Sequence, residues 1–270
     1  MELTYYGCAL ITLKCGDFKL LLDPYFSRNP KTYSPEAEYF DDVDAVLITH
    51  GHFDHIDDLP ALTERNPNLP IYCTERVKKN LKTIGIKGGD FRLFKPGDSF
   101  KIGPLNVKSI KSVHIKYDFA YIALHAVSPD FYRRFFKSFK AAADLKRSPI
   151  DGECLEYLIE GDGESVLVAG SLGVDDTIKH PENVDVFVLP YNGRWIVNKQ
   201  MYDHVKRIKP KKIFMSHFDP AFPPMCLDAK PQRFVNFMRK MGENIDIIIP
   251  EYEKVYKVKE ETAHKTAANL

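Results

Sequence analysis

The sequence predicts an α/β fold in one domain of 270 residues. Short apolar runs rich in β-branched residues occur in both halves of the chain, and amphipathic helical segments lie between them. No internal repeat, low-complexity tract or linker divides the sequence, and its apolar fraction of 44% is normal for a protein with a core. We therefore expect one continuous domain in which helices are interspersed with strands.

The first half of the chain is expected to form strands separated by turns and two helices. Gly16-Asp17 is suited to a tight hairpin turn between the first two strands. Thr74 is a good N-cap for the second helix. The expected strands are Ala9–Cys15, Phe18–Leu22, Val43–Ile48, Leu69–Cys73 and Asn106–Val113, and the expected helices are His55–Glu64 and 74–83.

The second half is expected to begin with a hairpin that turns at Gly161-Asp162-Gly163. Its expected strands are Glu153–Glu160, Ser165–Ala169, Val184–Pro190, Lys212–Ser216 and Ile245–Ile249. Its expected helices are Asn198–Ile208 and Pro231–Met241, and the polar tail from Lys259 is expected to fray.

A further helix is expected at about 129–147, as an insertion into the domain. Phe131, Phe135 and Phe139 fall on one face of it, and basic side chains fall on the other. The aromatic face either packs on the core, closes over the active site as a lid, contacts a second copy, or forms a surface for acidic or lipid-like substrates. Because five of the nine residues 131–139 are aromatic, we expect this helix to line or gate the site.

Four side chains able to bind a metal follow the strand Val43–Ile48 within six positions: His50, His52, Asp54 and His55. Histidine nitrogen and aspartate oxygen are the usual ligands of zinc and related metals. Residues two apart in an extended loop point the same way, so His50 and His52 can converge on one ion. Asp54 and His55 can face a second ion beside the first.

Composition argues against several other classes of protein. No run of eighteen apolar residues is present, so no membrane span is expected, and residues 1–6 lack the features of a signal peptide. The five cysteines include no C-x-x-C pair, which favours buried free thiols in a reducing cytoplasm. A net charge of +1 makes nucleic acid an unexpected partner.

The motif His-x-His-x-Asp-His after an apolar strand resembles the signature of the metallo-β-lactamase superfamily. Residues 20–27 resemble its first motif, Val113-His114 its lone third histidine and 215–218, which include His217, its last motif. In pattern the chain is most similar to the branch that contains L-ascorbate-6-phosphate lactonase and N-acylphosphatidylethanolamine phospholipase D. The resemblance implies an αββα sandwich of two face-to-face mixed β-sheets flanked by helices, with the site at one edge.

The resemblance also implies roles for individual residues. His50, His52 and His114 would hold one metal, and Asp54, His55 and His217 a second. Asp54 would be the catalytic residue that orients a water or takes its proton. Asp23, at the end of a strand, would brace the histidine loop by hydrogen bonds.

The sequence departs from the family pattern at Ser171. In the family this strand ends Gly-Asp and the aspartate bridges two metals, whereas here it ends Gly170-Ser171. A neutral hydroxyl offsets the repulsion between two dications poorly, so we expect one tightly held metal. Asp175 or Asp176 is the alternative source of the missing acid.

These features together predict a cytoplasmic metal-dependent hydrolase that acts on a phosphoester or lactone-type ester of a small anionic molecule. Zinc is the expected metal, as one or two ions, with manganese and iron as alternatives. A nuclease-like phosphodiesterase and a non-catalytic metal-binding relative are the alternative functions. The sequence leaves open whether the chain forms an oligomer.

Overall fold

The computed structural model describes residues 1–115, 153–173, 175–191, 197–221 and 229–259, and within them the strands form two mixed sheets of seven strands each. The first sheet has the order β14-β1-β2-β3-β4-β5-β6. Its strands are β1 (Glu2–Gly7), β2 (Leu10–Cys15), β3 (Phe18–Leu22), β4 (Ala45–Leu47), β5 (Pro70–Thr74), β6 (Asp90–Phe94) and β14 (Val255–Lys257).

The second sheet has the order β13-β12-β11-β10-β9-β8-β7. Its strands are β7 (Ser99–Ile102), β8 (Leu105–Ser112), β9 (Cys154–Gly161), β10 (Glu164–Ala169), β11 (Val186–Pro190), β12 (Lys212–Ser216) and β13 (Asp246–Ile248). Parallel pairs run from β10 to β13, and antiparallel pairs run from β7 to β10.

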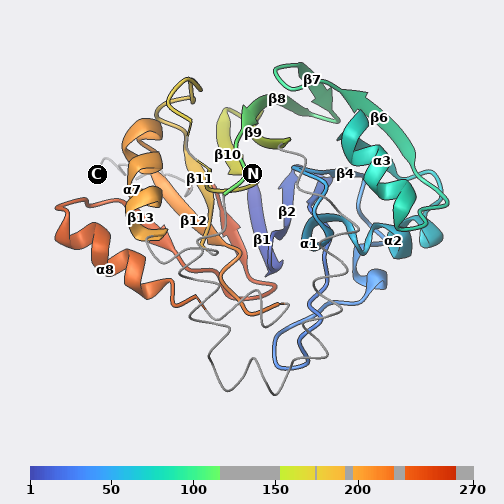
Figure 1. Cartoon of the computed structure of the whole chain (residues 1–270), viewed down its shortest axis with the longest axis horizontal. Helices are drawn as coiled ribbons and strands as arrows, with labels where there is room; N and C mark the ends of the chain where they lie inside the picture. The colour runs from blue at the N-terminus through green and yellow to red at the C-terminus, as the bar shows by residue number, and fades with distance from the viewer. Residues whose placement is uncertain (116–152, 174, 192–196, 222–228, 260–270) are drawn as a thin grey trace, which may run out of the picture.

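Helices cover the outer side of each sheet (Figure 1). Outside the first sheet lie the 3₁₀-helix η1 (Ala37–Phe40) and the helices α1 (Phe53–Ile56), α2 (Leu59–Arg65) and α3 (Glu75–Thr83). Outside the second sheet lie α7 (Val197–Ile208) and α8 (Gln232–Lys240). Among the described helices none is both long and apolar enough to span a membrane.

Three layers of buried apolar side chains hold these elements together. The central layer lies between the sheets and joins residues of both, such as Leu13 and Leu20 from the first with Tyr157 and Val188 from the second. A second layer packs α1, α2 and α3 on the first sheet, and a third packs α7 and α8 on the second. Because each sheet is covered on both faces, its inner strands read as continuous apolar runs. The predicted αββα sandwich is confirmed.

Most of the expected elements are found within one or two residues of their predicted ends. The hairpin between β2 and β3 is confirmed, and Thr74 caps α3 by accepting a hydrogen bond from the Val77 N–H at 3.4 Å. The prediction of one helix over His55–Glu64 is wrong, because two short helices, α1 and α2, cover this stretch. Pro60 lies in the first turn of α2, where its missing N–H costs least, and so favours a new helix start. The expected helix at 129–147 lies outside the described residues.

The strand directions bring six strand ends to one edge of the sandwich. In the first sheet β1, β3 and β4 run the same way, and in the second sheet β8, β10 and β12 do. Hydrogen bonds join the two sheets there, from the Leu155 N–H to the Thr49 carbonyl at 3.2 Å and from the His217 N–H to the Cys8 carbonyl at 2.7 Å. The predicted site residues follow these strand ends directly.

Candidate metal centre

Three histidines from two sheets converge at this edge. His50 and His52 follow β4, and His114 lies two residues beyond β8. The His50 Nε2 and the His52 Nδ1 lie 3.1 Å apart, and the His52 and His114 rings are 4.3 Å apart between centroids. One nitrogen from each of the three side chains lies within 4.8 Å of the other two. The structure therefore brings together the three residues expected to form the all-nitrogen site.

The chemistry of these three side chains fits a zinc-class ion. At a tetrahedral zinc the nitrogens of two ligands are separated by roughly 3.3 Å, given bond lengths of about 2.0–2.1 Å. The 3.1 Å separation of the His50 and His52 nitrogens is close to this value. Burial lowers the pKa of His52 to about 3 and that of His114 to about 4, and it holds the pKa of His50 well below its usual range. Neutral imidazoles with available lone pairs are the form that binds metals.

Asp54 lies beside this group, together with His217 at the end of β12. The His217 Nε2 lies 3.1 Å from the Asp54 Oδ2. Burial of Asp54 would by itself raise the pKa of its carboxyl. The charges of His55 and His217 and the His217 hydrogen bond outweigh burial and hold this pKa below its usual range. Asp54 is therefore a buried carboxylate that stays ionised at neutral pH.

Cys8, at the end of β1, is a site residue that the sequence did not indicate. Its Sγ lies 3.5 Å from the His217 Nε2, and with Asp54 it completes a second group whose ligand atoms lie within 4.8 Å of one another. The Asp219 carboxylate accepts a hydrogen bond from the Cys8 N–H at 2.8 Å. Burial raises the pKa of the Cys8 thiol, so only a cation beside it would convert it to a thiolate ligand. The sequence predicts buried free thiols, and the four cysteines in the described part of the chain, Cys8 among them, are free and buried.

His55 is held by Asp23 from behind. The His55 Nδ1 donates to the Asp23 Oδ2 at 2.8 Å, and the His55 Nε2 lies 3.9 Å from the Asp54 Oδ2. Asp23 also accepts two hydrogen bonds at 2.7 Å from Thr49, one from the backbone N–H and one from the hydroxyl. One carboxylate thus fixes both the start of the histidine loop and the orientation of the His55 ring.

Three of the seven described residues other than glycine that have a positive φ lie at this edge. Cys8, Asp23 and His217 have φ values of 52°, 47° and 55°, in the left-handed region that side chains other than glycine seldom adopt. Each such residue costs on the order of 1–3 kcal/mol and is held only where its surroundings fix it. Each of the three directly follows the end of a strand, and each has its side chain in the site.

We expect Asp23→Asn to weaken zinc binding or turnover by about 10–100-fold, the usual effect of losing an outer partner of a metal ligand. The amide retains the shape of the side chain but loses the carboxylate oxygen that accepts a hydrogen bond from the His55 Nδ1. Zinc titration of the metal-free variant measures the change. Asp44→Asn is the matched control, since the exposed Asp44 also accepts a backbone hydrogen bond, from Lys19, away from the site. An equal effect of both substitutions would contradict the assigned role.

Ser171 follows the end of β10 at this edge and brings no charge to it. It is 6% exposed, and its hydroxyl accepts a hydrogen bond from the Ile115 N–H at 3.0 Å. Neither alternative acid replaces it, because Asp175 accepts hydrogen bonds from Thr177 and Asp176 pairs with Arg207. Within the two described groups of ligand atoms at this edge, Asp54 is the one carboxylate.

We expect Ser171→Asp to add close to one further equivalent of tightly bound zinc to the chain. A carboxylate there would offset the repulsion between two dications about 3.5–4 Å apart. Calorimetric titration of the metal-free proteins, with zinc counted by mass spectrometry, gives the difference. Ser171→Ala is the control and should add none, so a gain in that variant, or none in Ser171→Asp, would count against the electrostatic explanation.

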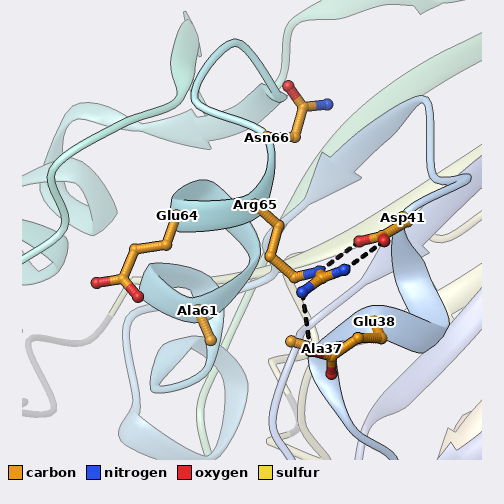
Figure 2. Close-up of a pocket in the computed structure, with 7 residues that line it drawn as sticks. All are labelled: Ala37, Glu38, Asp41, Ala61, Glu64, Arg65 and Asn66. Carbon is orange, nitrogen blue, oxygen red and sulfur yellow. Dashed lines mark hydrogen bonds and ion pairs between the residues drawn. The ribbon is translucent and has the colours of Figure 1, made fainter.

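A surface hollow beside α2 and η1 is a separate feature (Figure 2). Arg65 crosses it and binds Asp41 through two nitrogens, at 2.6 and 2.5 Å, and Glu38 at 2.8 Å. Because these two acids already neutralise its cation, the hollow is a poor site for an anionic substrate. The candidate metal centre lies on other elements.

Comparison with known proteins agrees with this geometry. The model of the beta-lactamase superfamily domain matches residues 19–222. A UPF0173 metal-dependent hydrolase of Pyrococcus furiosus is 23% identical over 92% of this chain and 96% of its own length. The structure of Igni18, a metallo hydrolase from Ignicoccus hospitalis, matches with a TM-score of 0.66 at 20% identity, over 96% of this chain and 99% of that one. An isothiocyanate hydrolase from Delia radicum gut bacteria matches with a TM-score of 0.64 at 19% identity, over 95% and 98%.

The chain belongs to the beta-lactamase superfamily domain family, whose matched region contains all of the predicted metal-binding motifs. It is a metal-dependent hydrolase of the metallo-β-lactamase superfamily, as the sequence predicted. The relatives support this level of description; the lactonase and phospholipase D branch, the metal and the substrate go beyond it.

Proposed function

We propose that this protein is a cytoplasmic zinc hydrolase that cleaves a phosphoester or lactone-type ester of a small anionic molecule. His50, His52 and His114 would hold the ion, and Asp54, His55, His217 and Cys8 would line its other side. The convergence of three neutral imidazoles beside an ionised, buried carboxylate supports the proposal most directly. The four buried free thiols favour the cytoplasm.

A bound zinc ion supplies Lewis acidity to the scissile group and acidifies a water beside it. Asp54 would accept a hydrogen bond from a water held there and so would orient it toward the substrate. Since the pKa of Asp54 is held below its usual range, Asp54 is better suited to orienting the water than to keeping its proton. This favours the first of the two roles that the sequence left open.

His55 and His217 both lie beside the same carboxylate oxygen of Asp54, the Oδ2. The His55 Nδ1 contacts Asp23, and the Nε2 of the same ring lies 3.9 Å from the Asp54 Oδ2. The His217 Nε2 lies 3.1 Å from the same Asp54 oxygen. The contact with the His217 Nε2 thereby limits the rotation of the Asp54 carboxylate.

A substrate panel tests the proposal. Zinc-loaded protein is offered a phosphomonoester, a phosphodiester and two lactones of different ring size, and the chelated protein and His52→Ala serve as controls. We expect hydrolysis of a monoester or a lactone that chelation abolishes and zinc restores. Diester cleavage with a steep salt dependence would instead indicate the nuclease-like alternative. A folded, zinc-loaded protein inactive on every compound would favour the non-catalytic relative.

A further inference from the structure

A charged side chain lies buried in the apolar layer beneath α7. Along β9 the alternate residues Leu155, Tyr157 and Ile159 face the core between the sheets. Glu156 therefore faces the other way, toward α7, and its exposure is 0%. A fully buried carboxylate is rare unless it is paired or binds a metal. Glu156 thus requires partners of matching chemistry.

Two buried histidines from separate segments supply these partners. His180, in the connection between β10 and β11, places its Nδ1 2.9 Å from the Glu156 Oε2. His204, on α7, lies on the same buried face as Met201 and Val205. One ligand atom from each of Glu156, His180 and His204 lies within 4.8 Å of the others. Neither histidine lies in a sequence motif, so the sequence alone predicts a structural or solvated side chain at both positions.

His204 distinguishes this cluster from a simple ion pair. Its exposure is 1%, yet among the described residues neither of its ring nitrogens has a hydrogen-bond partner. The Leu172 carbonyl lies beside the ring without completing a hydrogen bond of normal geometry. A buried imidazole normally satisfies its N–H and its lone pair. The third ligand of a metal site needs a ring nitrogen that is free to bind the ion. His204 offers one, and it lies within 4.8 Å of a carboxylate oxygen and of a second imidazole.

We propose that Glu156, His180 and His204 bind a second divalent ion of the zinc class in a structural site beneath α7. Two imidazoles and one carboxylate form a zinc donor set. The Ser112 hydroxyl, which donates to the Glu156 Oε1 at 2.9 Å, supports the carboxylate as an outer partner. The 2.9 Å between the His180 Nδ1 and the Glu156 Oε2 is near the tetrahedral ligand separation of roughly 3.3 Å, and one ring nitrogen of His204 lies within 4.8 Å of both ligand atoms.

The location of this site gives it a role distinct from catalysis. Its three ligands come from β9, from the segment before β11 and from α7, so one ion would tie the helix layer to the sheet. It also adjoins the candidate metal centre through the chain: Ser112 precedes His114 by two residues, and Leu172 follows Ser171 directly. An ion here would fix the strand ends that present His114 and Ser171, while its burial excludes substrate.

Metal counting in matched variants tests the inference without any use of activity. The protein is stripped with chelator, reloaded with zinc, dialysed and measured by mass spectrometry. We expect Glu156→Gln and His204→Gln each to lose the same equivalent of zinc, and His52→Ala to lose a different one. In the His52→Ala background zinc at about 100-fold over its Kd should raise Tm by about 5–10 °C. In His52→Ala/Glu156→Gln most of that rise should disappear.

The outcomes separate this inference from the proposed function. Unchanged zinc content and an unchanged Tm response in both glutamine variants would overturn it and leave a buried ion pair of Glu156 and His180. Loss of activity, or loss of the equivalent of zinc that depends on His52, tests the proposed function and not the site beneath α7. If the glutamine variants do not fold, anomalous scattering at the zinc edge from crystals of the unmodified, zinc-loaded chain decides, because a peak beside Glu156 supports the site and its absence overturns it.

Discussion

Asp54→Asn should lower kcat by about 10²–10⁴-fold, the range expected when a group that directs proton transfer is lost. The amide keeps the size of the side chain but replaces an ionised oxygen acceptor near His55 and His217 with a neutral group. Zinc at the three-histidine group should persist, because Asp54 is not one of its members. Turnover and zinc content, measured on the same preparation, give the two parts of this expectation.

Asp42→Asn is the control for this experiment. Asp42 is exposed and pairs with Lys19 at 2.8 Å, so its substitution changes the same charge far from the centre and should leave kcat unaltered. Full activity of Asp54→Asn on any substrate that the enzyme cleaves would contradict the role given to this carboxylate. Loss of zinc in proportion to activity would show that Asp54 holds the ion instead.

The part of the site that the sequence predicts is the part that is local in the chain. His50, His52, Asp54 and His55 lie within six consecutive positions, so one strand end and one short turn are enough to bring them together. Cys8 could not be found in this way. It meets His217 across 209 positions of sequence, and nothing around Cys8 marks it as different from the other buried cysteines. Only the shared edge of the two sheets makes it a neighbour.

The fold shows the same division between local and distant information. Hairpins and amphipathic helices have short periodic signals, and the predictions for the β2–β3 and β9–β10 hairpins and for α3, α7 and α8 hold to within a residue or two. The strand β14 was not predicted, since Val255–Lys257 is three residues long and becomes a strand by pairing with β1 at the other end of the chain. The pair of buried histidines beneath α7 was missed for the same reason, because His180 and His204 approach each other only after the sheet and helix have packed.

The geometry around Asp23 gives a physical reason for strain in an otherwise regular sandwich. Asp23 must leave β3 with a positive φ for its carboxylate to reach both Thr49 and His55. A relaxed, extended residue there would direct its side chain to one face of the sheet and reach neither. The cost of the conformation is offset by three hydrogen bonds to a buried carboxylate, of the stronger, charge-assisted kind. The strained backbone at Asp23 thereby allows hydrogen bonds to hold the histidine loop in place.

His52→Ala should release the zinc of the three-histidine group. Its Nδ1 lies 3.1 Å from the His50 nitrogen and its ring 4.3 Å from that of His114, so it is the ligand that joins the other two. Two imidazoles hold zinc far less tightly than three, and the loss should exceed the roughly 10–100-fold that removal of an outer partner costs. After dialysis the variant should contain close to one equivalent of zinc less than the unmodified protein.

The control for metal lost in handling is Lys95→Ala, a substitution at an exposed position, taken through the same purification. Circular dichroism of His52→Ala establishes that the sandwich has formed, which we expect because its core lies between the sheets and the histidine loop lies at their edge. Burial lowers the pKa of His52 to about 3, so at neutral pH this ring is neutral and able to bind zinc. A folded His52→Ala protein with unchanged zinc stoichiometry and affinity would show that the ion is held elsewhere, and the group of Cys8, Asp54 and His217 would then be the one to test next.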